Sequence, residues 1–230
     1  MADVDVLKRN AAEAALKHVK PGMVLGLGTG STARHFLEGL SRLIGSGMEV
    51  KAVPTSFATA EAAKRLGIPL TSLEEHVRLD LCVDGADEVD PKLDLIKGLG
   101  GALFREKIVA AASRKFVVIV DDSKLVPRLG TKAPVPVEVH PFGWRHAAAA
   151  IGALGAKVEM RRQDGRDFRT DNDNHILDAR FGPIRAPAKL AGELSAIPGV
   201  VGHGLFVRMA SVVFVASGKG VRTLRATRTS

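Results

Sequence analysis

Residues 79–122 read LDLCVDGADEVDPKLDLIKGLGGALFREKIVAAASRKFVVIVDD, and this stretch decides the fold class. An apolar run that ends in aspartate and glycine comes first. An acidic, glycine-rich loop follows, and then helical spacing over residues 102–113. The stretch closes on a strongly β-branched run at residues 115–122. Strand, helix and strand in this order predict a βαβ unit, whose two strands lie parallel in one sheet.

The same alternation of strands and helices covers the first 130 residues. Ser31 or Thr32 is placed to cap the second of the predicted helices. We therefore expect an α/β fold built on an open, mostly parallel, Rossmann-like sheet. The further predicted strands lie at residues 24–28 and 50–56, and the further helices at residues 4–19, 31–44 and 57–67.

The pattern changes near residue 130, where three prolines fall between residues 127 and 136. Residues 131–205 then predict strand, helix, strand, strand, helix and strand, with a turn at residues 170–174. That order is the split βαβ pattern of a ferredoxin-like α+β domain. Residues 210–218 form one more apolar strand, which could return to the first sheet. We predict a Rossmann-like domain of residues 1–130 plus 206–230, and an inserted α+β domain of residues 131–205.

The formal net charge of +8 is unevenly distributed. Residues 1–130 hold 18 basic and 17 acidic side chains, residues 131–205 hold 10 and 8, and residues 206–230 hold 5 and 0. Nucleic-acid-binding faces usually show a basic stripe, often with aromatic residues. Aromatic residues are only 4% of this chain. We expect no nucleic-acid partner, and a solvated, partly disordered C-terminal end.

The single cysteine excludes an intrachain disulfide and indicates an intracellular protein. Cys82 lies in an apolar strand pattern, so we expect it to be buried and structural rather than a nucleophile. The N-terminal residues lack the basic start and apolar run of a secretory signal, and no apolar run approaches about 18 residues. We expect a cytoplasmic protein without a membrane partner.

The first of three polar loops that follow strands is GLGTGST, residues 26–32. Ligands of open α/β sheets bind outside the carboxyl ends of the strands, so these loops should meet at one crevice. The glycine spacing fits neither the dinucleotide fingerprint nor a P-loop. Glycines still let backbone N–H groups approach an anion at a helix N-terminus, and Thr29, Ser31 and Thr32 add hydroxyl donors. This suits a phosphate monoester; an ordinary strand–helix turn is an equally acceptable alternative.

The second loop is DGADEVD, residues 84–90. Asp84 and Asp87 flank a Gly-Ala turn, so both carboxylates could face one pocket. Paired carboxylates can bind Mg²⁺ or Mn²⁺, but no histidine lies near these loops to complete a transition-metal site. The hydroxyl groups of a sugar are the better partners, and we expect neither a metal nor a cofactor. Glu88 and Asp90 are expected to belong to a solvated turn.

The third loop opens KGLGGALFREK, residues 97–107. Lys97 supplies a point charge, and the glycines allow close approach of a ligand. Glu106 falls at the start of the predicted helix, where a lysine and the helix N-terminus would keep its carboxylate ionised, as a general base requires. A surface position is the alternative for Glu106. Together the three loops suit proton transfer beside the carbonyl of a phosphorylated sugar.

Four segments resemble the signature segments of the ribose-5-phosphate isomerase A family: GLGTGST, VDGADEVD, KGLGGALFREKIVAAAS and VVIVDDSKLV. VPTS, PVPVEV, TDNDNHILD and IPGVVGHGLF agree as well, so the resemblance covers nearly the whole chain in matching order. It implies an aldose–ketose isomerase that interconverts ribose 5-phosphate and ribulose 5-phosphate through an enediolate, in the non-oxidative pentose phosphate pathway. It also implies a homodimer.

The resemblance implies that Glu106 is the catalytic base, which takes the C2 proton and returns it at C1. Lys97 would stabilise the developing oxyanion, and either Asp84 or Asp87 could assist ring opening. The implied substrate-binding residues are Lys8, Thr29, Gly30, Ser31, Thr32, Asp84, Gly85, Ala86, Asp87, Lys97, Gly98, Leu99, Gly100 and Lys124.

Two residues depart from the family's pattern. Leu99 stands where the family often has glycine, which affects how the backbone follows the substrate. Phe104 stands where a small polar residue is usual, which affects the packing behind Glu106.

Two other functional classes share parts of this pattern. A non-catalytic sugar-phosphate sensor would share the anion loop but would need neither Glu106 nor Lys97. An acyl-CoA transferase with a related sheet would use a glutamate nucleophile and a larger ligand.

Overall fold

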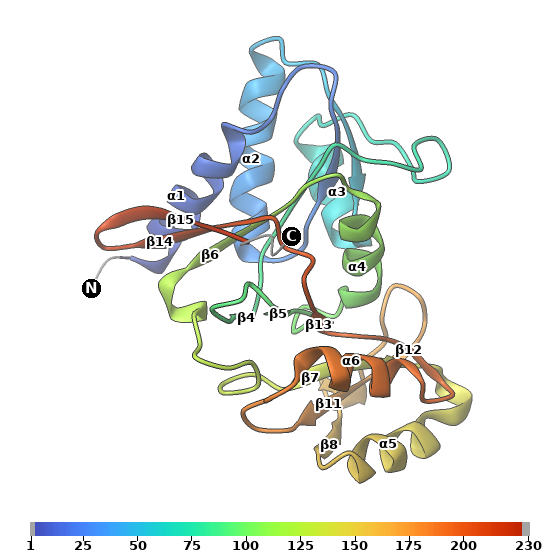
Figure 1. The fold of residues 1–230 in the computed structure, drawn as a ribbon. Helices are drawn as coiled ribbons and strands as arrows, with labels where there is room; N and C mark the ends of the chain where they lie inside the picture. Colours follow the sequence, from blue (N-terminus) through green and yellow to red (C-terminus); the bar gives the residue numbers. More distant parts are fainter. Residues whose placement is uncertain (1–2, 227–230) are drawn as a thin grey trace. The chain divides into compact units, whose positions relative to one another are not determined.

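A computed structural model describes residues 3–226 of the chain (Figure 1). These residues pack into two compact units. The first comprises the described residues up to Ala86, Arg105–Lys124, and the described residues from Met209 onward. The second comprises Asp87–Phe104 and Leu125–Arg208.

A six-stranded sheet forms the centre of the first unit. Its order is β15-β14-β6-β3-β1-β2, and every neighbouring pair is parallel except β14 with β15. The predicted strand at residues 210–218 returns to this sheet and pairs with β6, so this expectation is confirmed. The strands are β1 (Val24–Leu27), β2 (Lys51–Pro54), β3 (Leu81–Asp84), β6 (Phe116–Asp121), β14 (Val212–Ser217) and β15 (Gly220–Arg225).

Helices protect the apolar strands of this sheet from water. All six residues of β6 are buried, as expected for a central parallel strand covered on both faces. Helix α1 packs against α2, β6 and β14, and Phe36 and Leu40 of α2 are fully buried in the core. The helices are α1 (Val4–Leu16), α2 (Ser31–Gly45), α3 (Phe57–Arg65), α4 (Leu103–Ala112), of which the first two residues belong to the second unit, and the 3₁₀ helix η1 (Asp122–Lys124).

The basic C-terminal segment is more ordered than its composition predicts. Gly220–Arg225 form β15, which pairs antiparallel with β14 through residue Arg225 (Figure 1). The expectation of a partly disordered end was wrong for these residues, because the unpaired edge of β14 offers backbone partners that do not depend on side-chain polarity. Arg228, also part of that prediction, lies outside the described residues.

The second unit contains the predicted ferredoxin-like arrangement. Its four-stranded antiparallel sheet has the order β12-β7-β11-β8. Residues 170–174 form the predicted turn before β11, closed by a bond from the Asp173 N–H to the Thr170 carbonyl. The elements are β7 (Val135–Val139), η2 (Pro141–Gly143), α5 (Trp144–Ala153), β8 (Lys157–Met160), β11 (His175–Arg180), α6 (Pro187–Ser195) and β12 (Val200–His203).

A short hairpin between β8 and β11 was not predicted. Strands β9 (Arg162–Gln163) and β10 (Arg166–Asp167) pair antiparallel across Asp164 and Gly165, which have φ angles of 51° and 76°. An Asp-Gly pair with positive φ at both positions is the signal of a two-residue hairpin turn. The signal was present in the sequence, but two-residue strands leave no periodic pattern around it.

A three-stranded antiparallel sheet belongs to the second unit, and it places residues 87–104 in that unit. Strands β4 (Glu88–Val89), β5 (Leu95–Ile96) and β13 (Leu205–Phe206) pair in the order β13-β5-β4. The β5–β13 pair ties residues 87–104 to the segment that follows β12. The compact units therefore differ from the predicted domains, which assigned residues 87–104, 125–130 and 206–208 to the Rossmann-like part.

Glu88 is buried, so the expectation that it belongs to a solvated turn was wrong. Its side chain is fully buried, and its carboxylate accepts backbone hydrogen bonds from Gly130, Lys132 and Ala133 at 2.6, 2.5 and 2.7 Å. A buried carboxylate is tolerated where donors satisfy its oxygens. Glu88 thus anchors the loop before β7 to the small sheet of the second unit.

The structure bears on two features read from the sequence, the single cysteine and the membrane-spanning segments. Cys82 is buried within β3, so its structural assignment is confirmed. None of the helices within residues 3–226 has both the length and the apolar character needed to cross a bilayer.

The stability of the first unit is expected to fall when the pH is lowered through about 6.5, because of His18. Burial, followed by the charges of Lys115, Arg225 and Lys20, lowers the pKa of His18 below its ordinary value of 6.5. The unfolded chain then binds a proton in this window that the folded chain does not bind, so acid favours unfolding. Urea unfolding at pH 7.5 and 5.5 measures the effect. His18→Gln should reduce the difference, whereas His146→Gln, at an exposed position of α5, should preserve it.

Candidate active site

The predicted site residues are divided between the two units. The first unit holds Lys8, Thr29, Gly30, Ser31, Thr32, Asp84, Gly85, Ala86, Glu106 and Lys124, and the second holds Asp87, Lys97, Gly98, Leu99 and Gly100.

The loop after β1 lies directly against the end of β3. The Thr29 N–H donates to Asp84 Oδ1 at 3.2 Å, and the Gly28 N–H donates to the Val83 carbonyl at 2.9 Å. A Cβ on Gly28 would lie 2.1 Å from Asp84 Oδ1, so only glycine allows this approach. The structure therefore brings together the first two loops that the sequence singled out.

The side chain of Thr29 lies in a cluster of hydroxyl groups. Its hydroxyl oxygen lies 2.8 Å from Thr55 Oγ1, 2.9 Å from Ser56 Oγ and 3.1 Å from Thr59 Oγ1. The hydroxyls of Thr55, Ser56 and Thr59 donate to the Leu27 carbonyl, to Thr59 and to the Gly28 carbonyl, so the Thr29 hydroxyl is the donor toward this cluster. The expectation that it adds a hydroxyl donor for an anion stays a prediction. Thr55, Ser56 and Thr59 were not among the predicted site residues.

The N-terminus of α2 is open, as an anion site requires. Gly30, not Ser31 or Thr32, is the N-cap, with a φ of +106° and no capping side chain, so the predicted side-chain cap was wrong. The first N–H groups of a helix have no intrahelical acceptor, and they carry the positive end of the helix dipole. Gly30 and Ser31 are exposed and Thr32 is half-buried. Backbone donors at this end can therefore bind a phosphate.

Asp84 and Glu106 are buried carboxylic acids of the first unit. Asp84 has no exposed surface, and its Oδ1 also accepts from the Gly85 N–H at 2.7 Å. Glu106 is 5% exposed and lies in the first turn of α4, as predicted, where the helix dipole favours a carboxylate. The guanidinium of the neighbouring Arg105 stacks on the Phe57 ring at 4.4 Å. The surface alternative for Glu106 was wrong.

Lys97 is the buried cation of the second unit. Its side chain is 3% exposed, and Nζ lies 5.5 Å from the centre of the Phe206 ring. The backbone N–H of Lys97 donates to the Gly204 carbonyl at 2.9 Å. A Cβ on Gly204 would lie 2.1 Å from the Lys97 carbonyl oxygen. The contact of β5 with β13 thus sets the position of this lysine.

The loop after Lys97 is tied to Asp87. The Leu99 N–H donates to Asp87 Oδ2 at 3.0 Å. Gly98 has a φ of +108°, and Leu99 and Gly100 are exposed. Asp87, Lys97 and the glycine loop are therefore brought together within the second unit. Sequence reasoning missed Arg161, whose side chain also contacts this loop.

Phe104 and Leu99, the two departures from the family's pattern, lie in different surroundings. The Phe104 ring packs on Gly202 of β12, where an added Cβ would lie 3.1 Å from Phe104 Cδ2. Leu99 is 45% exposed. Phe104 therefore contributes to the packing of the second unit, and the Leu99 side chain is largely in solvent.

Lys8 and Lys124 are half-buried, on α1 and η1 respectively. Within the described part of the chain, neither side chain forms a hydrogen bond or ion pair with another residue. Asp121, at the end of β6, accepts from the Ser123 N–H at 3.0 Å and so shapes the turn that carries Lys124. Ala86, the last residue of its segment in the first unit, is half-buried.

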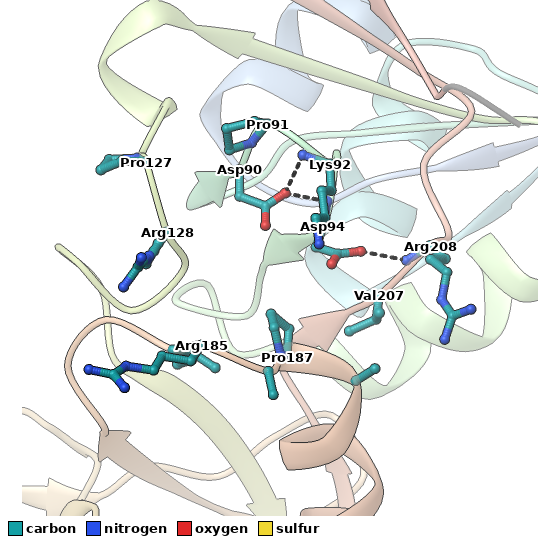
Figure 2. Close-up of a pocket in the computed structure, with 13 residues that line it drawn as sticks. Asp90, Pro91, Lys92, Asp94, Pro127, Arg128, Arg185, Pro187, Val207 and Arg208 are labelled. Carbon is teal, nitrogen blue, oxygen red and sulfur yellow. Dashed lines mark hydrogen bonds between the residues drawn. The ribbon is translucent and has the colours of Figure 1, made fainter. Parts of the chain in front are cut away.

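A cavity of about 540 Å³ in the second unit contains none of the predicted site residues (Figure 2). Its carboxylates, Asp90 and Asp94, belong to the loop between β4 and β5. Asp90 Oδ1 accepts from the N–H groups of Lys92 and Asp94, and Asp94 Oδ1 accepts from the Arg208 N–H. Burial raises the pKa of the Asp90 carboxyl. Asp90 does form a turn closed by its own carboxylate, through the bond from the Lys92 N–H, but it is buried, so the expectation that it is solvated was wrong.

The family model of ribose 5-phosphate isomerase A (phosphoriboisomerase A) matches residues 51–220. The chain belongs to this family. Ribose-5-phosphate isomerase A of Gloeobacter violaceus is 53% identical over 223 residues, which cover 96% of this chain and 97% of that protein. The protein of the same name from Rhodopseudomonas palustris is 54% identical over 229 residues, which cover 96% of this chain and 98% of that protein.

Solved structures of ribose-5-phosphate isomerases share the fold. The enzyme from Methanocaldococcus jannaschii is 43% identical with a TM-score of 0.93, covering 97% of this chain and 100% of that chain. Another, described in complex with phospho-erythronic acid, is 41% identical with a TM-score of 0.94, covering 97% of this chain and 99% of that chain. Family membership confirms the α/β fold class and the expected isomerase activity, and it decides against the sensor and transferase alternatives.

Proposed function

We propose that this chain interconverts D-ribose 5-phosphate and D-ribulose 5-phosphate through an enediolate, with Glu106 as the catalytic base. The burial of Glu106 in the first turn of α4 supports this assignment most directly, since the helix N-terminus favours the ionised carboxylate that a general base requires. The phosphate would bind the backbone donors at the N-terminus of α2. That a related enzyme is described with phospho-erythronic acid supports binding of a sugar phosphate.

The proposed reaction needs one base and one electrophile. Glu106 would remove the C2 proton to form the enediolate, and the ammonium of Lys97 would stabilise its charge. Glu106 would then protonate C1, while the proton of the C2 hydroxyl moves to O1. Either Asp84 or Asp87 would assist the opening of the sugar ring before these steps. Each of these roles is carried over from the resemblance and is part of the proposal.

A coupled assay for ketose formation from ribose 5-phosphate tests the proposed function. We expect turnover by the purified wild-type chain without added cofactor. Binding of ribose 5-phosphate without ketose formation would contradict the assignment, because that result is what a sensor would give.

Activity is expected to survive chelation. Within residues 3–226, no group of three or more His, Cys, Asp or Glu side chains is arranged to hold a metal ion. Lys97 can supply the positive charge that a metal would otherwise bring to the enediolate. Turnover after dialysis against EDTA should match that of the untreated enzyme. Loss of activity that Mg²⁺ or Mn²⁺ restores would instead assign a metal to the aspartates.

The homodimer implied by the resemblance, and the cytoplasmic location expected from the composition, are proposals of the same kind. Light scattering coupled to gel filtration measures the first, and fractionation of cells that produce the protein measures the second. A fully active monomer at the assay concentration would contradict the proposed homodimer.

A further inference from the structure

The glycine loop after Lys97 is held by a side chain from a distant part of the second unit. Arg161 lies between β8 and β9, and its Nη1 donates to the carbonyls of Gly98 and Leu99 at 2.8 and 3.0 Å. These two carbonyls belong to the segment that the resemblance assigns to substrate binding. Arg161 itself does not appear in that assignment.

The guanidinium of Arg161 is itself held in place. Its Nε and Nη2 donate to the two carboxylate oxygens of Asp178 on β11 at 2.9 and 2.5 Å. The side chains of Arg161 and Asp178 are only 11% and 23% exposed. A bidentate pair of this kind fixes orientation as well as distance. The Phe168 ring, 5.9 Å from Arg161 Cζ, also fills the space where a Cβ on Gly101 would lie.

These contacts determine the orientation of two consecutive peptide groups. In the Gly98–Leu99 peptide, the Gly98 carbonyl accepts a hydrogen bond from Arg161, and the Leu99 N–H donates one to Asp87. In the Leu99–Gly100 peptide, Arg161 holds the carbonyl, and the trans geometry directs the Gly100 N–H to the opposite side. Gly100 is exposed, and no acceptor among residues 3–226 takes its N–H. The loop therefore presents an oriented backbone donor that protein groups leave available.

We propose that Arg161 and Asp178 are positioning residues for catalysis, which hold the Lys97–Gly100 loop so that the Gly100 N–H can donate to an oxygen of the bound sugar phosphate. This inference rests on the proposed function, because it assumes that the loop contacts the substrate. It adds to that function a pair of side chains outside the four signature segments. Neither side chain needs to touch the substrate itself.

Three variants separate positioning from simple structural support. Arg161→Met removes both carbonyl contacts but leaves the Asp178 carboxylate unpaired, which can destabilise the fold. The double variant Arg161→Met/Asp178→Met removes both charges and so avoids that penalty. Arg161→Lys keeps the charge but lacks the planar fork that bonds two carbonyls and a carboxylate together. Arg162→Met is the matched control, since Arg162 is 70% exposed and pairs with Asp167 at 3.4 Å in the adjacent hairpin.

Displacement of reacting groups by about 1 Å can cost about 10²-fold in rate, so we expect kcat/KM of the double variant to fall by about that factor. Its melting temperature should exceed that of Arg161→Met. Arg161→Lys should lose activity by at least tenfold, about 1.4 kcal/mol, and Arg162→Met should match the wild type. A double variant that regains wild-type kcat/KM along with its stability would overturn the proposal, because the pair would then be purely structural. Wild-type turnover in the same assay tests the proposed function by itself, and the ratio of variant to wild type tests the positioning role.

Discussion

Glu106→Gln is expected to lose turnover by about 10²–10⁴-fold, which is the usual contribution of a general base. Glutamine has nearly the same shape as glutamate, so the side chain still fits a site that leaves 5% of Glu106 exposed. Its amide cannot accept the C2 proton. Substrate binding should persist, because the proposed phosphate donors at the N-terminus of α2 are unchanged. The loss should therefore fall on kcat rather than on KM.

Two measurements examine this expectation. Steady-state kinetics give kcat and KM, and loss of deuterium from C2 of labelled ribose 5-phosphate reports proton abstraction directly. Glu61→Gln is the matched control, since Glu61 is an exposed residue of α3 in the same unit. A Glu106→Gln protein with wild-type melting behaviour and turnover within tenfold of wild type would remove Glu106 as the base.

Lys97→Met is expected to lower kcat by about 10²–10³-fold, which is the typical loss when one donor to a developing oxyanion is removed. Methionine is similar in length and adapts to irregular apolar surroundings, so it can occupy the space beside the Phe206 ring. It carries no charge to stabilise the enediolate. Arg substitution should fail to restore activity, because the larger guanidinium must enter a site where Lys97 is 3% exposed.

Activity and folding are measured together for this variant. Lys157→Met serves as the control, since Lys157 is an exposed residue of β8 in the same unit, 2.8 Å from Glu159. Circular dichroism establishes that both variants are folded before kinetics are compared. If folded Lys97→Met turned over as fast as Lys157→Met, another group would have to stabilise the enediolate.

Several features could be predicted because their signals are local. The β-branched run at residues 115–122 became β6, with all its residues buried, and the helical spacing at residues 102–113 became α4. Burial and periodicity are linked within a single element, so a short stretch of sequence is enough to reveal them. The order of strands and helices then limits the topology, which is why the parallel sheet and the ferredoxin-like order were correct.

The directions of polar side chains could not be predicted in the same way. Thr29 lies in the expected loop, yet its hydroxyl faces Thr55, Ser56 and Thr59 rather than the open end of α2. Glu88 is buried because three backbone N–H groups, 42 to 45 residues later, converge on its carboxylate. The hydrogen-bond partner of a polar side chain is chosen by the whole packed unit, not by its neighbours in the chain.

The sequence by itself determined the fold class, the family and the positions of Asp84, Lys97 and Glu106 at or near the ends of strands and at a helix start. Tertiary structure alone decided how the loops are held. The β5–β13 pair joins residues more than 100 positions apart, and Arg161 bonds carbonyls 62 and 63 positions away. A contact between a side chain and a distant backbone carbonyl requires no particular residue at the carbonyl, so it leaves no motif in the sequence. It exists only once the strands of the second unit have brought the two segments together.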